Sequence, residues 1–177
     1  MGRVTRLAAR VAAARHVVRA PGAGALRKPT MFKHLLVPVD GSELTERAIV
    51  ASVEFAQQLG ASITGFIAEP LAPLPTPGRQ ASLMRQEAED HDTMTAAHAS
   101  AVLARFEAEA KRAGVPFVGR HAQVPRVDRA IIAAAESQGC DMIVMVTRGR
   151  GAFGEFLFGS QTKAVLAGSK LPLLVLH

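Results

Sequence analysis

A glycine-rich segment near the end of the chain has the residue types of an anion-binding site. Met142 to Val146 are consecutive apolar residues, which is typical of a strand buried on both faces. Residues 147–151 (TRGRG) interrupt this run, and Gly159 precedes a helix expected over residues 161–167. A loop and a helix N-terminus at the carboxyl end of a parallel strand present free backbone N–H groups, which bind phosphate. The candidate phosphate-binding residues are Gly149, Gly159, Ser160 and Gln161.

A carboxylate follows the first apolar run of the chain. Residues 31–40 (MFKHLLVPVD) are typical of a short strand, and Pro38 belongs near its end because proline has no N–H for a ladder bond. If the first and fourth strands are neighbours, Asp40 lies in the crevice at their carboxyl ends, where it can accept hydrogen bonds from ribose hydroxyls. The local alternative is that Asp40 accepts hydrogen bonds within the following turn. The residues alone leave both roles open.

The glycine spacing does not match the common nucleotide-binding motifs. No GK[ST] follows the glycines, which excludes a Walker A loop. Residues 149–154 match the letters GxGxxG, but no acidic residue follows at the distance that a dinucleotide-binding unit requires. Arg148 and Arg150 have two alternative roles, as phosphate contacts or as solvated loop charges.

The histidines predict no metal or catalytic site. His91 and His98 lie two helical turns apart and lack the i,i+4 spacing of a zinc pair, so we expect ordinary helix histidines that are satisfied or partly exposed. His121 has no recognisable partner, and no Ser-His-Asp or Cys-His set is visible. Because the chain has no Trp or Tyr, stacking platforms for single-stranded nucleic acid are not expected.

The first 30 residues differ in composition from the rest. They hold 7 of the chain's 21 basic residues and no acid, which leaves 14 basic and 15 acidic residues in 31–177. The basic pI therefore says nothing about the partners of residues 31–177, which we expect to form a single domain. Several alternatives remain open for residues 1–30: a disordered basic tail, a start codon placed before the true start at Met31, a transit-type peptide, or a tail that binds nucleic acid or acidic lipid.

One cysteine and the hydropathy pattern bear on location. Cys140 is the only cysteine, so no intrachain disulfide forms, and its place before a buried strand predicts a structural rather than a reactive thiol. No segment approaches 18 consecutive apolar residues, so no membrane span is expected. These features predict a cytoplasmic protein with no membrane partner.

Strand and helix patterns alternate along the whole domain. The expected strands are 31–40, 61–68, 115–123, 142–146 and 171–176, and the expected helices are 43–59, 82–113, 127–138 and 161–167. This alternation predicts a doubly wound α/β domain with a parallel sheet and right-handed crossovers. Pro172 predicts that the last strand lies at a sheet edge.

Local signals set the helix boundaries. Ser42 is the expected N-cap of the first helix and Ser160 that of the last, and Gly60, Gly114 and Gly139 are expected to end the first three helices. Apolar spacing predicts a buried face on the first helix, made of Leu44, Ala48, Ala51 and Phe55.

Four segments together resemble the universal stress protein (UspA) family. They are residues 31–49 (MFKHLLVPVDGSELTERAI), 62–70 (SITGFIAEP), 139–151 (GCDMIVMVTRGRG) and 159–177 (GSQTKAVLAGSKLPLLVLH). The resemblance spans residues 31–177. It implies a five-stranded parallel sheet of order 3-2-1-4-5 with four helices, a Rossmann-like fold of the adenine-nucleotide alpha-hydrolase type. It also implies a homodimer built through the last strand, residues 171–176.

The resemblance assigns roles to particular residues. Members of the family that bind ATP carry G-x-x-G, nine residues, and then G-[ST]. Gly149 and Gly159-Ser160 match the last two parts, whereas Val146 stands at the first glycine and places a side chain where backbone should approach ribose or phosphate. The implied nucleoside-pocket residues are Pro38, Asp40 and, through its backbone, Ile67.

The function implied by the resemblance is that of a stress-response regulatory domain. It would bind ATP, with Mg²⁺, or a related adenine nucleotide weakly, as a regulatory ligand rather than a substrate. One alternative, which Val146 favours, is a nucleotide-free dimeric interaction module that acts through protein partners. A slow ATPase is the other alternative, although no general base is visible beside the loop.

Overall fold

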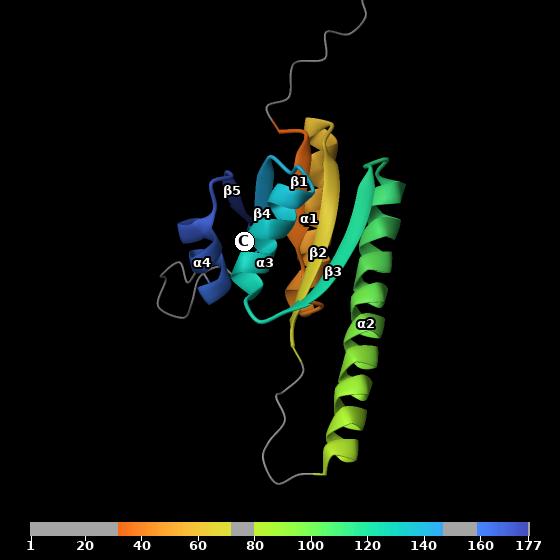
Figure 1. Cartoon of the computed structure of the whole chain (residues 1–177). Helices are drawn as coiled ribbons and strands as arrows, with labels where there is room; N and C mark the ends of the chain where they lie inside the picture. Colours follow the sequence, from red (N-terminus) through yellow and green to blue (C-terminus); the bar gives the residue numbers. More distant parts are fainter. Residues whose placement is uncertain (1–31, 72–79, 147–158, 177) are drawn as a thin grey trace, which may run out of the picture.

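The computed structural model describes residues 32–71, 80–146 and 159–176. In these residues strands and helices alternate (Figure 1). In chain order they are β1 (His34–Pro38), α1 (Glu43–Leu59), β2 (Ser62–Pro70), α2 (Ala81–Arg112), β3 (Phe117–Val124), α3 (Val127–Ser137), β4 (Met142–Val146), α4 (Ser160–Gly168) and β5 (Leu173–Leu176).

The strands form one parallel sheet with helices on both faces. Its order is β3-β2-β1-β4-β5, and every neighbouring pair is parallel. The side chains of α1 and α2 pack into the core on one face, and those of α3 and α4 pack into the core on the other. In Figure 1, α3 lies in front of the strands. The predicted doubly wound sheet of order 3-2-1-4-5 is thus confirmed.

Alternate residues of the central strands supply the two cores. Leu35 and Val37 of β1 enter the core under α1 and α2, whereas Leu36 between them enters the core under α3 and α4. All three are fully buried, at 0% exposure. In β4, likewise, Val144 and Ile143 are buried on opposite faces. Burial on both faces explains why these strands are continuous apolar runs rather than alternating ones.

Glycines end the first three helices. Gly60, Gly114 and Gly139 have φ angles of 65°, 71° and 66°, in the left-handed region that only glycine adopts without strain. The backbone N–H after each glycine donates back into the helix, as Cys140 does to the Ala135 carbonyl over 2.9 Å. The three predicted helix ends are therefore confirmed.

The buried face of α1 was predicted incorrectly. Its buried residues are Thr45, Ala48, Ile49, Ser52, Val53 and Ala56. Of the predicted face only Ala48 is buried, and Leu44, Ala51 and Phe55 are half-buried. The true face includes hydroxyl side chains that hydrophobicity does not reveal. They are tolerated there because they are hydrogen-bonded, as Ser52 Oγ is to the Ile49 carbonyl at 3.1 Å.

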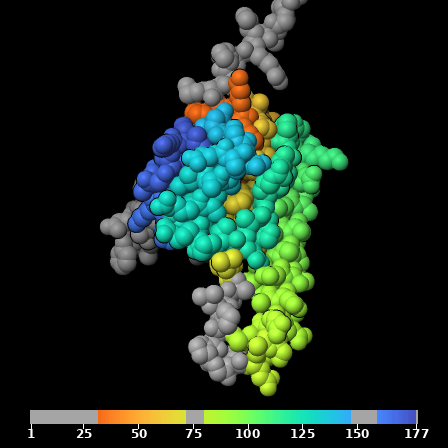
Figure 2. Space-filling view, in the orientation of Figure 1, coloured from red at the N-terminus to blue at the C-terminus, as the bar shows by residue number. Residues whose placement is uncertain are grey.

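β2, β3 and α2 reach beyond β1. The β1–β2 pairing ends with Pro38 opposite Phe66, whereas β2 and β3 remain paired to Pro70 and Val124. The strand predicted over residues 61–68 is therefore longer than expected. The first residue of α2 to be buried is Ala99, and the preceding turns project past the sheet (Figures 1 and 2).

Among the helices of the described residues, none combines the length and apolarity that crossing a membrane requires.

The start of β1 is held by a distant carboxylate. The Oδ2 atom of Asp141 accepts a hydrogen bond from the backbone N–H of Lys33 at 2.8 Å, and Oδ1 accepts one from His34 at 3.0 Å. The backbone N–H of Asp141 in turn donates to the His34 carbonyl over 2.9 Å. The residue directly before β4 therefore also fixes where β1 enters the sheet.

Candidate functional site

The candidate site lies where the strand order reverses, at the carboxyl ends of β1 and β4. Leu35 lies opposite Met142 and Leu36 opposite Ile143. Continuing this register places Val39 beside Val146, so Asp40 leaves β1 where β4 ends. β2 and β3 extend to one side of this point and β5 to the other. In open α/β sheets, ligands bind at such a switch point.

Asp40 is held by the turn that follows it. Its Oδ1 atom accepts hydrogen bonds from the Ser42 backbone N–H at 3.0 Å and from Thr45 Oγ1 at 3.3 Å. Partial burial alone would raise the pKa of Asp40, but the hydrogen bonds from Ser42 and Thr45 outweigh it and hold the pKa below the ordinary 3.8. The carboxylate is thus ionised at neutral pH. Asp40 therefore does accept hydrogen bonds within the following turn, which is the local alternative considered from the sequence. The Asp40 residue is nevertheless exposed.

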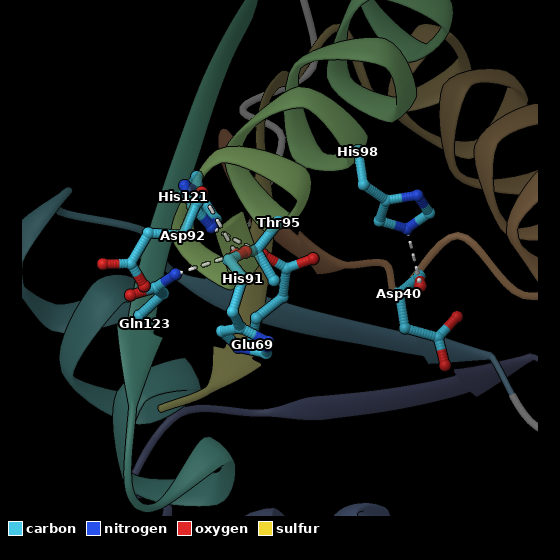
Figure 3. Close-up of polar contacts among 8 residues, drawn as sticks. All are labelled: Asp40, Glu69, His91, Asp92, Thr95, His98, His121 and Gln123. Atoms are coloured by element: carbon cyan, nitrogen blue, oxygen red, sulfur yellow. Dashed lines mark hydrogen bonds and ion pairs between the residues drawn. The ribbon is translucent and has the colours of Figure 1, made fainter. Parts of the chain in front are cut away.

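A histidine from α2 covers this turn, residues 40–42, called here the Asp40 turn. His98 Nε2 lies 3.4 Å from the Asp40 carbonyl oxygen (Figure 3). Gly41 has a φ of 75°, and a Cβ atom built on it would lie 2.2 Å from His98 Nε2. No local sequence pattern predicts this contact, because it joins residues that are 58 positions apart.

Next to the Asp40 turn, no strand of the described residues pairs with β2 on the side of β1. The Val39 N–H donates to the Phe66 carbonyl over 2.9 Å, and the β1–β2 pairing stops there. Backbone groups of successive strand residues face alternate sides, so those of Ile67 face β3 and those of Ala68 face the side that β1 has left. The Ile67 side chain is fully buried, at 0% exposure, so only its backbone can border a ligand.

The N-terminus of α4 offers backbone donors. Gly159 is its N-cap and Ser160 its first residue, so the N-cap expected at Ser160 lies one residue earlier. The first helical hydrogen bond runs from the Lys163 N–H to the Gly159 carbonyl at 3.1 Å, which leaves the preceding N–H groups without acceptors inside the helix. Gly159, Ser160 and Gln161 are exposed. Arg148, Gly149 and Arg150 lie outside the described residues.

Val146 closes β4. It lies opposite Leu176 of β5, is half-buried, and packs against the core that contains Val37 and Val39. Its side chain therefore leaves the sheet on the face covered by α1 and α2.

A polar cluster joins α2 to the extended ends of β2 and β3 (Figure 3). His121 Nε2 lies 2.8 Å from Glu69 Oε2, and these side chains are 25% and 13% exposed. Gln123 Nε2 donates to Thr95 Oγ1 over 2.9 Å, and Thr95 donates to the His91 carbonyl. The sequence alone showed no partner for His121. Its partner is 52 residues away and is brought near only by strand pairing.

Two further side chains bear on the sequence predictions. His91 Nε2 is buried and has no hydrogen-bond partner among the described residues. Cys140 is 6% exposed, and burial raises the pKa of its thiol to about 11, as expected of a structural cysteine. In the described part of the chain, no group of three or more His, Cys, Asp or Glu side chains is placed to hold a metal ion.

Comparison with known proteins gives one consistent answer. Among protein-family models, that of the Universal stress protein family matches residues 31–177. A relative from Thermus aquaticus, the "universal stress protein in QAH/OAS sulfhydrylase 3′ region", is 31% identical over 151 residues, covering 83% of this chain and all of the relative.

Solved structures show the same fold. A universal stress protein in complex with cAMP has a TM-score of 0.57 at 22% identity, with 82% of this chain and 97% of that chain covered. The universal stress protein from Archaeoglobus fulgidus in complex with dAMP has a TM-score of 0.53 at 18% identity, with coverages of 82% and 98%. With the family match spanning residues 31–177, these findings establish that the chain belongs to the universal stress protein family.

Proposed function

We propose that the chain binds ATP or a related adenine nucleotide weakly, as a regulatory ligand rather than a substrate, between the carboxyl ends of β1 and β4. One observation carries this proposal. Asp40 leaves β1 next to the end of β4, at the point where the strand order reverses. Two structural relatives were solved with cAMP and dAMP, which supports an adenine nucleotide as the class of ligand.

The described residues fit such a ligand. The backbone amides of Gly159, Ser160 and Gln161 at the N-terminus of α4 would bind phosphate, together with the loop at Gly149. Any Mg²⁺ would be coordinated by the phosphates of the ligand. A Cβ atom built on Gly159 would meet no atom of the described residues within 4 Å, which supports close approach of a ligand there. Asp40 would accept hydrogen bonds from the ribose. The base would lie near Pro38 and the backbone of Ile67, beside the edge of β2 that is free at Ala68.

Calorimetric titration of ATP with Mg²⁺ into the full chain tests this function, with Val146→Gly and Asp40→Asn run in parallel. We expect weak binding to the native chain and tighter binding to Val146→Gly, because removing the side chain lets a ligand approach the backbone. Asp40→Asn should weaken binding by about tenfold, the effect of losing a charged hydrogen-bond acceptor. If the native chain bound no nucleotide at millimolar concentration, the proposal would be wrong.

A second candidate is a nucleotide-free dimeric module that acts through protein partners. Val146 at the first motif glycine favours it, and binding only by Val146→Gly would support it. In either case we propose a homodimer formed through residues 171–176. The apolar strand β5, all of it half-buried, ends the sheet and supports this assembly.

We also propose a division of the chain into two parts. Residues 31–177 would form the domain, and residues 1–30 a separate basic extension. We propose a cytoplasmic location, supported by the single buried thiol of Cys140, which needs no oxidising compartment.

A further inference from the structure

α2 approaches the candidate site at one point, the Asp40 turn. His98 and Val102 lie one turn apart on the same face of α2. Atoms of both side chains lie close to the position that a Cβ atom on Gly41 would occupy. A Cβ atom on Gly41 would lie 2.2 Å from His98 Nε2, 2.4 Å from its Cε1 and 3.3 Å from Val102 Cγ2. The imidazole thus occupies the place that any side chain at position 41 would fill, and it packs directly on the backbone of the turn.

The same imidazole is placed to hold the turn by a hydrogen bond. His98 Nε2 lies 3.4 Å from the Asp40 carbonyl oxygen, which can only accept, so the ring must carry its proton on Nε2. The Asp40 side chain is already tied to the other side of the turn through Ser42 and Thr45. The backbone and the side chain of Asp40 are therefore fixed from different elements, α2 and α1.

We propose that His98 is a positioning residue for the nucleotide site. By packing on Gly41 and donating to the Asp40 carbonyl, it holds the Asp40 turn in the conformation that presents the carboxylate to the crevice between β1 and β4. The effect on nucleotide affinity rests on the proposed function. The effect on the Asp40 turn does not, because it is a property of the protein without ligand.

The ligand-free arm of the test measures amide hydrogen exchange by NMR at Ser42 and Thr45, whose N–H groups donate to Asp40 Oδ1 and to the Ser42 carbonyl. In the full chain, His98→Ala should speed exchange at both amides by about 2- to 10-fold, equivalent to one ordinary hydrogen bond. His98→Gln should restore most of the protection, because the glutamine amide reaches the position of Nε2. Met94→Ala, one turn earlier on α2 and at a position that is 73% exposed, is the matched control and should change nothing.

The ligand arm repeats the ATP titration with the same variants. His98→Ala should weaken affinity by about 2- to 10-fold and His98→Gln should recover it. If the native chain binds no nucleotide but exchange follows the expected pattern, the proposed function fails while His98 still positions the turn. Unchanged exchange in His98→Ala, or equal losses in His98→Ala and His98→Gln, would overturn the role of His98.

Discussion

His91 has a polar atom that is buried without a partner. Its backbone carbonyl accepts from Thr95, and the neighbouring His121 pairs with Glu69, but Nε2 of His91 meets no donor or acceptor among the described residues. A buried polar atom of this kind costs free energy, because its hydrogen bond to water in the unfolded chain is lost and not replaced. The buried Nε2 atom of His91 therefore lowers the stability of the α2 face that covers the ends of β2 and β3.

We predict that His91→Leu stabilises the protein. An apolar side chain of similar size removes the unsatisfied atom, and the free energy of unfolding should rise by about 1 kcal/mol. Urea unfolding followed by circular dichroism measures this. Ala97→Leu, at an exposed position of α2, controls for the effect of leucine on the helix itself. A lower stability for His91→Leu would show that Nε2 makes a useful interaction in solution.

At the scale of elements, α2 is held on the sheet by an aromatic pair. The rings of Phe106 in α2 and Phe117 in β3 lie 4.8 Å apart at 44°. Both rings pack over Gly65 of β2: a Cβ atom there would lie 2.7 Å from Phe117 and 3.0 Å from Phe106. Gly65 therefore sets how closely α2 can approach the sheet.

We predict that Gly65→Ala is destabilising. The added methyl group would push both rings outward, an overpacking cost of about 1–3 kcal/mol. Gly119→Ala is a close control, because Gly119 lies opposite Gly65 in the sheet and the atoms nearest to its added Cβ would be side-chain atoms of Leu103, from 3.3 Å. We expect that variant to stay within about 0.5 kcal/mol of the native chain in urea unfolding. Equal losses in the two variants would mean that the sheet, not the aromatic pair, resists a side chain.

The elements were predictable from the sequence because their signals are local. Five apolar residues in a row at Met142–Val146, and a glycine after each of the first three helices, are visible without knowledge of the fold. Side-chain partners were not predictable for the opposite reason. Glu69 meets His121, and His98 meets the Asp40 turn, only after strands and helices from distant parts of the chain have packed. At the candidate site the sequence indicated Asp40 and the α4 N-terminus, and it gave no reason to include α2.

For the molecule as a whole, the two edges of the sheet differ. β3, at one edge, packs against α2, and its exposed residues include Arg120 and His121. β5, at the other, consists of four half-buried apolar residues. The Ile143 N–H donates to the Pro172 carbonyl, so the backbone groups of Leu174 also face β4, while those of Val175 face away from the sheet. An apolar strand with outward-facing backbone groups is suited to pairing with a second copy.

We predict that Val175→Pro abolishes the proposed homodimer. Proline removes an N–H group on the free side of β5 and leaves the ladder to β4 intact, as edge strands tolerate. Sedimentation velocity should show a monomer whose melting temperature stays near that of the native chain. Leu174→Pro, which removes an N–H that faces β4, should instead lower the melting temperature. A Val175→Pro dimer would exclude β5 pairing as its basis.

The hydrogen bonds that Asp141 accepts from the start of β1 affect how the domain would respond to a pulling force. Any pull transmitted through the polypeptide before Phe32 reaches two charge-assisted hydrogen bonds, to Lys33 and His34, before it reaches the β1–β2 ladder. Those bonds are accepted by Asp141, directly before β4, so the load passes into the middle of the sheet and not along one strand. The Asp40 turn lies at the far end of β1. We therefore expect the domain to tolerate tethering or fusion at its amino end, with its carboxyl-edge site unchanged.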